Sequence, residues 1–507
     1  MATPGELLAA SLEVMKKAQR EGIVRSSETG RTHRERLLRS GFLREITRGW
    51  LLVTDPSLPE GTSTPWYASY WAFVRRYLNE RFDDEYCLSP EASIKLQAGS
   101  TIVPGQLVVI TSKKVAQHLS LPFNTSLLIY QDEKRFPESR TNRNGLWMMD
   151  LSSALCRLQP ATFKNDPTDT ELALRMVRDA SQLLRILLEG GNTAIAGRLA
   201  GGYKFLGEDE MASRIVKGME AAGYKIRISN PFERDAPALT GGTKIISPYV
   251  SRIEALWKSM REDVIAAFPK APGLPKNPEQ YISKVEKVYI SDAYNSLSIE
   301  GYEVTAGLIE RVRDGKWNPA DLQDKQQRDA LAAKGYSLAF KAVEESIKKI
   351  LAGDNPGEVV RIDHHDWYSQ MFSPSVQTGI LKPSDLAGYR NGQVFIKGSK
   401  HIPLPKEAVL DCMETLFGLL KEENDAGVRA VLGHFIFVFI HPYMDGNGRM
   451  GRFLMNAMLA SGGYPWTVIR LARREQYMSA LEEASVNGRI RPFAEFIREE
   501  MEEKAHS

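Results

Sequence analysis

Apolar residues near the start of the chain recur at the three- to four-residue spacing of a helix, and two short apolar runs of strand length follow. The apolar positions of the first helix are Leu7, Leu8, Leu12 and Met15. A second helical stretch around residues 34–39 ends at Gly41, a residue type common just past helix ends. The two strands are Phe42 to Ile46 and Trp50 to Val53, with residues 47–49 as the turn. Residues 1–55 are therefore predicted to form a small domain of two helices and a hairpin.

This first segment is also strongly basic. Between Lys16 and Arg48 it carries ten lysines and arginines but only four glutamates. Helices followed by a hairpin suggest a winged helix, and residues 41–53 (GFLREITRGWLLV) resemble the winged-helix front of antitoxins from abortive-infection toxin–antitoxin systems. Two interpretations stay open: a module that binds DNA phosphates with its arginines, or a solvated basic face of a domain that docks a protein. The charge density favours DNA as a partner of residues 1–55.

The middle of the chain, residues 66–240, begins with a mixture of helical and strand patterns and then becomes helical. The runs Gln106 to Thr111 and Ser126 to Tyr130 are rich in strand-forming residues, and residues 170–225 are helical. Glycines interrupt this helical part at Gly190, Gly191, Gly197, Gly201 and Gly202. No Gly-Lys-Ser/Thr follows them and no strand precedes them, so they indicate turns and close helix contacts rather than a phosphate loop.

Everything from about Glu279 onward reads as one α-rich unit, with a short β interlude at Gln393 to Lys397. Its apolar helix through Gly433 to Ile440 should end at His441, because Pro442 disfavours helical geometry in the residue before it. The 507 residues suffice for about three domains, so the expected fold is multidomain and mainly α.

The composition of the chain argues against several classes of protein. The three cysteines lie far apart without a C-x-x-C pair, which argues against a zinc or redox site and favours a reducing, cytoplasmic compartment. A net charge of +3 is too small to indicate nucleic-acid binding by the whole molecule. The longest apolar run, Val431 to Ile440, is about half a membrane span, and Glu6 and Glu13 argue against a signal peptide. A soluble protein without a membrane partner is expected.

The chemistry lies in residues 441–452, HPYMDGNGRMGR. Gly446 and Gly448 allow successive N–H groups to converge on an anion, and the N-terminus of the following helix adds donors. Arg449 and Arg452 stand three residues apart and share one helix face. Such a cradle suits phosphoryl or nucleotidyl transfer. The alternative is a capped turn between two helices.

Two further residues of this segment supply reactive groups. His441 is a base that is largely neutral near pH 7, and Asp445 is a hard oxygen ligand suited to Mg²⁺. In the alternative of a simple turn, a backbone carbonyl would satisfy His441.

His441 to Arg452 resembles the Fic signature, His-Pro-Phe-x-Asp/Glu-Gly-Asn-Gly/Lys-Arg followed by a second arginine. The one departure is Tyr443 for the usual Phe, which keeps the ring and adds a hydroxyl that needs a partner. The resemblance implies an enzyme that moves AMP from ATP to a hydroxyl side chain of a target protein and releases pyrophosphate. Gly448 stands where a phosphorylating branch of the family has Lys, and so favours nucleotidyl transfer.

The resemblance also implies a role for each residue of the signature. His441 would deprotonate the acceptor hydroxyl and Asp445 would hold Mg²⁺. Asn447 and the backbone from Gly446 to Gly448 would hold the α and β phosphates, with Arg449 assisting. Arg452 would reach the γ phosphate.

Two other segments resemble parts of the same family. Residues 390–398 resemble the β-hairpin flap that registers a target peptide by strand addition, here through Gln393, Val394, Phe395 and Ile396. An ordinary surface hairpin is the alternative. Near the C-terminus, Tyr477 and Asn487 are candidates for the wall of the base pocket, and structural packing explains them equally well.

Upstream, Ser296 to Gly301 (SLSIEG) matches the Ser/Thr-x-x-x-Glu-Gly/Asn inhibitory motif of Fic proteins. Ser296 and Glu300 lie one helical turn apart, and Gly301 is a good helix stop. If this helix packs beside the signature helix, Glu300 should pair with Arg452 and suppress activity; a solvated glutamate is the alternative. The resemblance covers residues 279–498, predicted as an all-α Fic domain with this inhibitory helix.

The favoured function is an autoinhibited protein adenylyltransferase that uses Mg-ATP. The alternatives are a Fic enzyme that uses another nucleotide or removes AMP, and a DNA-binding regulator or antitoxin-like protein. The sequence leaves the target protein, the role of residues 66–240 and homodimer formation open.

Overall fold

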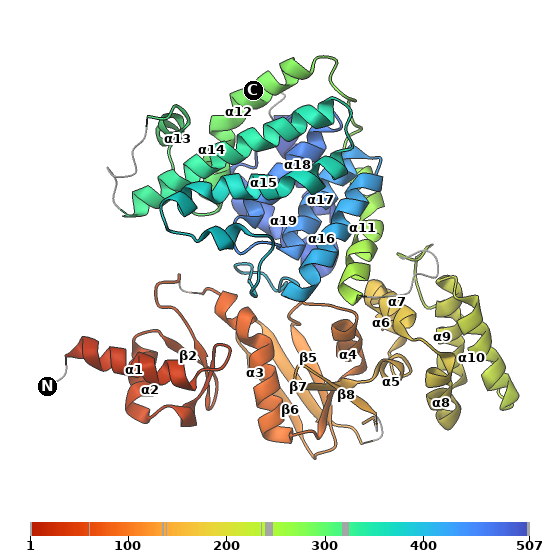
Figure 1. The fold of residues 1–507 in the computed structure, drawn as a ribbon. Helices are drawn as coiled ribbons and strands as arrows, with labels where there is room; N and C mark the ends of the chain where they lie inside the picture. The colour runs from red at the N-terminus through yellow and green to blue at the C-terminus, as the bar shows by residue number, and fades with distance from the viewer. Residues whose placement is uncertain are drawn as a thin grey trace. The chain divides into compact units, whose positions relative to one another are not determined.

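The computed structural model describes residues 3–59, 61–133, 136–137, 139–234, 236–238, 247–316 and 324–503. The chain divides into two compact units, one of residues 1–252 with 395–402 and one of residues 253–394 with 403–507 (Figure 1). The expected multidomain, mainly α fold is confirmed. The finer boundaries of 1–55, 66–240 and 279–498 stay predictions.

The first unit begins with two helices and a small sheet. The elements are α1 (Pro4–Ala18), β1 (Ile23–Arg25), α2 (Arg31–Arg39), β2 (Leu43–Thr47) and β3 (Trp50–Val53). The strands pair antiparallel in the order β1-β3-β2 over a core of Val24, Leu37, Leu43 and Leu51. The two helices and the hairpin lie where the apolar pattern predicts them, whereas the three-residue β1 was missed. The winged-helix assignment stays a prediction.

Part of the positive charge of residues 16–48 holds this small domain together. Arg25 donates to the Gly49 carbonyl at 3.0 Å, and Arg34 donates to the Ser26 carbonyl at 2.8 Å. Arg36 donates to the Ser11 hydroxyl at 2.7 Å. These three guanidinium groups serve the fold, so fewer cations are left for DNA than the sequence suggests. DNA binding by residues 1–55 stays a prediction.

A mixed sheet forms the centre of the first unit. Its strands are β4 (Tyr86–Leu88), β5 (Gln106–Thr111), β6 (Ala116–Leu121), β7 (Thr125–Gln131), β8 (Arg140–Arg143) and β9 (Leu146–Met149), in the order β6-β7-β5-β4-β9-β8. The helices beside these strands in the sequence are α3 (Thr64–Phe82) and α4 (Pro90–Gln97). Trp66, Tyr70 and Phe73 of α3 share a buried core with Leu127 and Ile129 of β7. The predicted strands β5 and β7 and the α/β character are confirmed.

Six short helices complete this unit. They are α5 (Leu151–Leu155), α6 (Pro160–Asn165), α7 (Pro167–Met176), α8 (Ala180–Gly190), α9 (Thr193–Phe205) and α10 (Asp209–Ala221). Gly191 ends α8 in the left-handed conformation, with φ +59°. Gly197 and Gly201 of α9 lie against the carbonyl oxygens of Arg227 and Ser229, where an added Cβ would overlap them. The prediction of turns and close contacts is confirmed.

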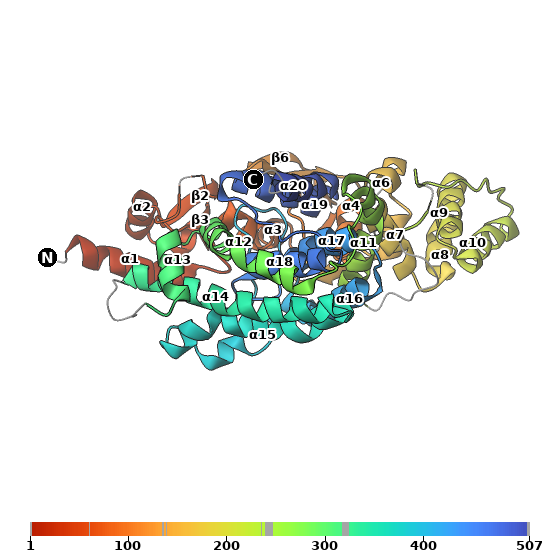
Figure 2. The ribbon, with the colours of Figure 1, turned by 90° about the horizontal axis from the view of Figure 1, so that it is seen from above.

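The long regular elements of the second unit are all helices among its described residues. Its helices are α11 (Pro248–Ala267), α12 (Pro278–Ile299), α13 (Ala306–Arg313), α14 (Asp324–Leu351), α15 (Pro356–Gln377), α16 (Lys406–Glu422), α17 (Ala426–Ile440), α18 (Asn447–Ala460), α19 (Arg474–Asn487) and α20 (Arg491–Glu503). Nearly every residue of α17 and α18 is buried, so this helical hairpin is the centre of the unit. Helices α14 and α15 pack side by side along it (Figures 1 and 2). None of the described helices is long and apolar enough to cross a membrane.

The predicted β-hairpin at Gln393 to Lys397 is wrong. This segment is extended but forms no strand, and the Gln393 side chain donates to the Pro403 carbonyl at 2.9 Å where a ladder would need a backbone donor. Residues 395–402 belong to the first unit, where the Lys400 carbonyl accepts from the Val103 N–H at 2.9 Å. The backbone just after this segment therefore bonds to a residue distant in sequence, and no internal hairpin forms among the described residues.

The tight contact of Gly201 generates a prediction about stability. Gly201→Ala should lower the free energy of unfolding of the first unit by about 1–3 kcal/mol, because the new methyl group meets the Ser229 carbonyl, which cannot rotate away. Urea titration followed by hydrogen exchange of peptides from residues 193–229 measures the change. Gly105→Ala is the control, since its added Cβ comes no closer than 3.9 Å to any atom. Equal losses in both variants would contradict the role of this contact.

Candidate active site

The buried helix α17 ends at His441, as Pro442 predicts. His441 adopts the left-handed conformation, with φ +56° and ψ +62°, and its N–H still donates to the Phe437 carbonyl at 3.0 Å. The imidazole Nδ1 lies 3.1 Å from the Val438 carbonyl oxygen. Because a carbonyl can only accept, Nδ1 carries the proton and Nε2 holds a free lone pair. Nε2 of His441 is therefore the basic atom.

Burial lowers the pKa of His441 to about 4, although the hydrogen bond to Val438 partly opposes this effect. The ring is thus neutral across the physiological range. It can accept a proton from a hydroxyl group without first having to lose one.

The loop after His441 is closed by Asn447. Its Oδ1 accepts from the Tyr443 N–H at 2.9 Å and its Nδ2 donates to the Tyr443 carbonyl at 2.8 Å. Gly446 precedes α18 with φ +83°, a conformation that suits glycine, and Phe372 packs against it. The first N–H groups of α18, which no helical hydrogen bond can use, are thereby left at a helix end suited to an anion.

Two arginines of α18 flank this end, and both are buried. Arg449 donates to Asp445 Oδ2 at 3.2 Å and lies over the rings of Tyr302 and Phe372, 5.3 and 5.1 Å from their centroids. Arg452 is 3% exposed. Its Nη1 is buried without a hydrogen-bond partner among the described residues, which is a costly arrangement unless an anion binds there.

Arg452 is held by the motif at the end of α12. Its Nε donates to the Ser296 hydroxyl at 2.9 Å and its Nη2 to the Ser296 carbonyl at 3.0 Å. Nη2 also pairs with Glu300 Oε1 at 2.7 Å, so the expected ion pair is present. Glu300 follows α12 directly, and Gly301 leaves the helix with φ +89°, the predicted stop.

The Glu300 carboxylate lies over the start of α18, since a Cβ added at Gly448 would overlap its Oε1 and come within 3.2 Å of Arg452 Nη1. Burial alone would raise the pKa of Glu300, but the charges of Arg452 and Arg449 outweigh burial and hold that pKa below its usual range. A negative charge therefore lies at the anion-binding end at neutral pH.

Asp445 is the one signature residue placed to hold a metal. Its side chain is 67% exposed, and its Oδ1 accepts from the Gly446 N–H at 2.7 Å. The described residues contain no cluster of three or more His, Cys, Asp or Glu able to hold a metal ion. Mg²⁺ commonly takes one or two carboxylates and completes its shell with water and phosphate oxygens, so Asp445 fits a metal that arrives with a nucleotide.

Arg390 is a site residue that the sequence did not single out. Its Nε donates to the His441 carbonyl at 2.8 Å, its Nη1 to the Gly392 carbonyl at 2.9 Å, and its Nη2 to the Leu404 carbonyl. Its own N–H donates to the Pro442 carbonyl at 2.9 Å. One buried guanidinium thus ties the end of α17 to the start of the segment predicted as the flap and to Leu404, which follows that segment. No local pattern around Arg390 signals this role.

Tyr443 finds the partner that its hydroxyl requires, His365 Nδ1 at 3.2 Å, and its ring stacks on Tyr368 with centroids 3.8 Å apart. Tyr477 is buried and its hydroxyl lies 2.8 Å from His434 Nε2. Asn487 lies exposed at the end of α19 and donates to Glu483 at 3.1 Å. Among the described residues, no hydrogen bond joins Asn487 to the cradle, so its role in a base pocket stays a prediction.

Residues 363–459, which contain this site, match the family model described as the Fic/DOC family. The chain contains a Fic domain. Among curated relatives, the protein adenylyltransferase Fic of Nematostella vectensis is 25% identical over 250 residues, 48% of this chain and 55% of that protein. The protein adenylyltransferase Fic of Drosophila virilis is 28% identical over 216 residues, 42% of this chain and 41% of that protein. The matches thus span about half the length of these relatives.

A solved fragment of Fic-1 from C. elegans is 17% identical and aligns with a TM-score of 0.38, covering 67% of this chain and 90% of that one. A score this low does not show a shared overall arrangement. The Fic assignment therefore rests on the matched residues 363–459 and on the signature within them.

The geometry of His441 predicts its titration. In ¹⁵N-histidine spectra of the full chain, the His441 ring should be the Nδ1–H tautomer at neutral pH and should protonate only near pH 4. The spectrum of His441→Ala identifies its signals. A pKa of 6 or above (near the reference value), or an Nε2–H tautomer at neutral pH, would contradict the assignment of Nε2 as the base.

Proposed function

We propose that this chain is a protein adenylyltransferase that Glu300 holds inactive. The observation that carries the proposal is the pairing of Glu300 with Arg452 directly over the start of α18, beside an anion-binding helix end. The Fic domain and the names of the curated relatives support AMP transfer from ATP as the reaction.

The residues of the signature have distinct tasks in this reaction. Nε2 of His441 would take the proton of the acceptor hydroxyl, whose oxygen then attacks the α phosphorus while the bond to pyrophosphate breaks. The N–H groups of residues 446–448 and the two arginines would bind the phosphates. Asp445 would hold Mg²⁺, which when bound would neutralise charge on the phosphates.

Glu300 would block this reaction in two ways. It occupies Arg452, the guanidinium best placed to bind a phosphate, and it places a carboxylate where phosphate oxygens should lie. Because its pKa lies below the usual range, Glu300 stays ionised at mildly acidic pH. The block should therefore persist under mild acidification and yield only when the carboxylate is removed or displaced.

Removing the carboxylate tests the inhibition. Glu300→Gly should raise transfer of AMP by about 10- to 1,000-fold, since about 1.4 kcal/mol of barrier corresponds to each tenfold. The measurement is intact-mass spectrometry of the chain and of lysate proteins after incubation with Mg-ATP, which also identifies the transferred group. Glu279→Gly, an exposed glutamate in the first turn of the same helix, is the matched control.

The double variant Glu300→Gly with Arg452→Ala should lose this gain, because the guanidinium freed by the first change is absent. Equal transfer by the wild type, Glu279→Gly and Glu300→Gly at saturating Mg-ATP would show that Glu300 is structural. Loss of mass from a modified target would instead assign removal of AMP.

The role of the imidazole is tested separately. In the Glu300→Gly background, His441→Ala should reduce transfer by about 10²- to 10⁴-fold, the usual contribution of a general base. Binding of ATP should change little, because the phosphates are held by α18 and its arginines. Calorimetry measures the affinity for ATP, and the same mass assay measures the rate of AMP transfer. An unchanged rate would exclude His441 as the base.

A further inference from the structure

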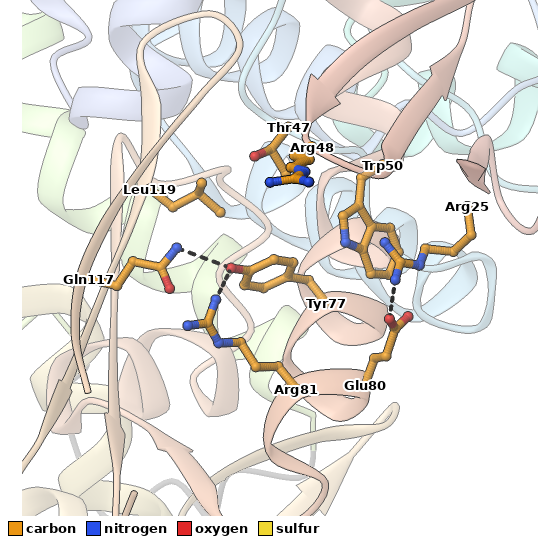
Figure 3. Close-up of a pocket in the computed structure, with 9 residues that line it drawn as sticks. All are labelled: Arg25, Thr47, Arg48, Trp50, Tyr77, Glu80, Arg81, Gln117 and Leu119. Atoms are coloured by element: carbon orange, nitrogen blue, oxygen red, sulfur yellow. Dashed lines mark hydrogen bonds and ion pairs between the residues drawn. The ribbon is translucent and has the colours of Figure 1, made fainter. Parts of the chain in front are cut away.

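A cavity in the first unit, far in sequence from the Fic signature, has the groups of a ligand site. Its volume is about 470 Å³, within the range that holds small organic ligands. It lies between the β2–β3 turn of the small N-terminal domain and the residues of α3 and β6 (Figure 3). Its lining residues are Arg25, Thr47, Arg48, Trp50, Tyr77, Glu80, Arg81, Gln117 and Leu119.

The lining of this cavity carries more positive than negative side chains. Three arginines face one glutamate, and Glu80 already pairs with Arg25, which also lies 4.4 Å above the Trp50 ring. Arg48 and Arg81 have no carboxylate partner among the described residues. Two guanidinium groups at one cavity favour a ligand with a phosphate group, which arginine binds through several hydrogen bonds.

The hydroxyl of Tyr77 supplies a third donor. It accepts from Arg81 Nη1 at 2.8 Å and from Gln117 Nε2 at 3.2 Å, as Figure 3 shows. With both lone pairs used in this way, its own proton remains to be donated, and no acceptor for it is found in the described part of the chain. Tyr77 is 7% exposed, so this donor is held in a fixed position by its packing.

Gln117 adds a hydrogen-bond acceptor to these hydrogen-bond donors. Its Oε1 is buried without a hydrogen-bond partner among the described residues, an arrangement that a ligand hydroxyl or amino group would relieve. Leu119 and the edge of Trp50 give the cavity an apolar wall. A bare phosphate would use the arginines and Tyr77 but would leave Gln117 Oε1 and the apolar wall without a partner.

We propose that this cavity binds a nucleotide, with the phosphate on Arg48, Arg81 and the Tyr77 hydroxyl and a sugar or base donor on Gln117. The shared chemistry allows a free nucleoside monophosphate or one nucleotide of a single-stranded nucleic acid. The site is independent of the proposed adenylyl transfer, since none of its residues lies in the Fic domain.

Binding of AMP to the full chain by calorimetry at low ionic strength tests the proposal. Tyr77→Phe removes one hydroxyl from a charge-assisted contact and should weaken binding at this site by about tenfold. Arg48→Gln and Arg81→Gln should each do at least the same. Arg39→Gln, an exposed arginine at the end of α2 that does not line the cavity, removes the same charge and should leave binding unchanged.

AMP bound at the cradle of the Fic domain should contribute equally in all these variants. Photo-crosslinking with 8-azido-AMP shows whether AMP is bound at the cradle or in the cavity. Label on peptides containing residues 47–50 or 77–81, lost in Tyr77→Phe, would support the cavity as a free-nucleotide site. A ten-residue oligothymidylate that binds in the same variant-dependent way while AMP does not would assign a strand of nucleic acid. Binding of either probe that Tyr77→Phe and the arginine variants leave unchanged, or inorganic phosphate binding as tightly as AMP, would overturn the proposal.

Discussion

The burial of α17 and α18 on all sides determines where each reactive group of the Fic domain lies. Apolar side chains such as Phe435, Ile436 and Phe453 are fully buried, so neither helix can slide or rotate without exposing them. The end of α17 then carries His441 and the start of α18 carries the anion-binding N–H groups. The short loop between them, closed by Asn447, keeps the base and the cradle adjacent.

Arg452 is a buried charge of this hairpin whose ionic partner comes from elsewhere in the chain. A buried guanidinium without a counter-charge is strongly destabilising, and Glu300 provides that charge in the structure as it stands. The contact that stabilises the helical hairpin is thus the same contact that would exclude a nucleotide. Because 28% of the Glu300 side chain is exposed, an arriving phosphate can compete for the guanidinium without first opening the core.

The two sites proposed to bind anions differ in how they are built. The cradle in the Fic domain combines a helix N-terminus with buried arginines, and the Glu300 carboxylate lies beside it. The cavity near Tyr77 has two arginines without carboxylate partners and one oriented hydroxyl, and no acidic residue other than Glu80, which Arg25 neutralises. The first arrangement suits chemistry on a tightly held phosphate, and the second suits reversible binding.

The sequence by itself determined the features that depend on a few neighbouring residues. The end of α17 before Pro442, the left-handed Gly446, the strands β5 and β7, and the close packing at Gly201 all follow from local geometry and apolar spacing. Only the tertiary structure decided the contacts between distant segments. It brought together Glu300 and Arg452, which are 152 positions apart and whose pairing the sequence predicted only on condition that their helices pack together. It also used Arg390 to hold the His441 carbonyl and left residues 393–397 without a hairpin. The physical reason is that a charge or a backbone donor takes whichever partner the packed chain brings near, and local spacing does not specify that partner.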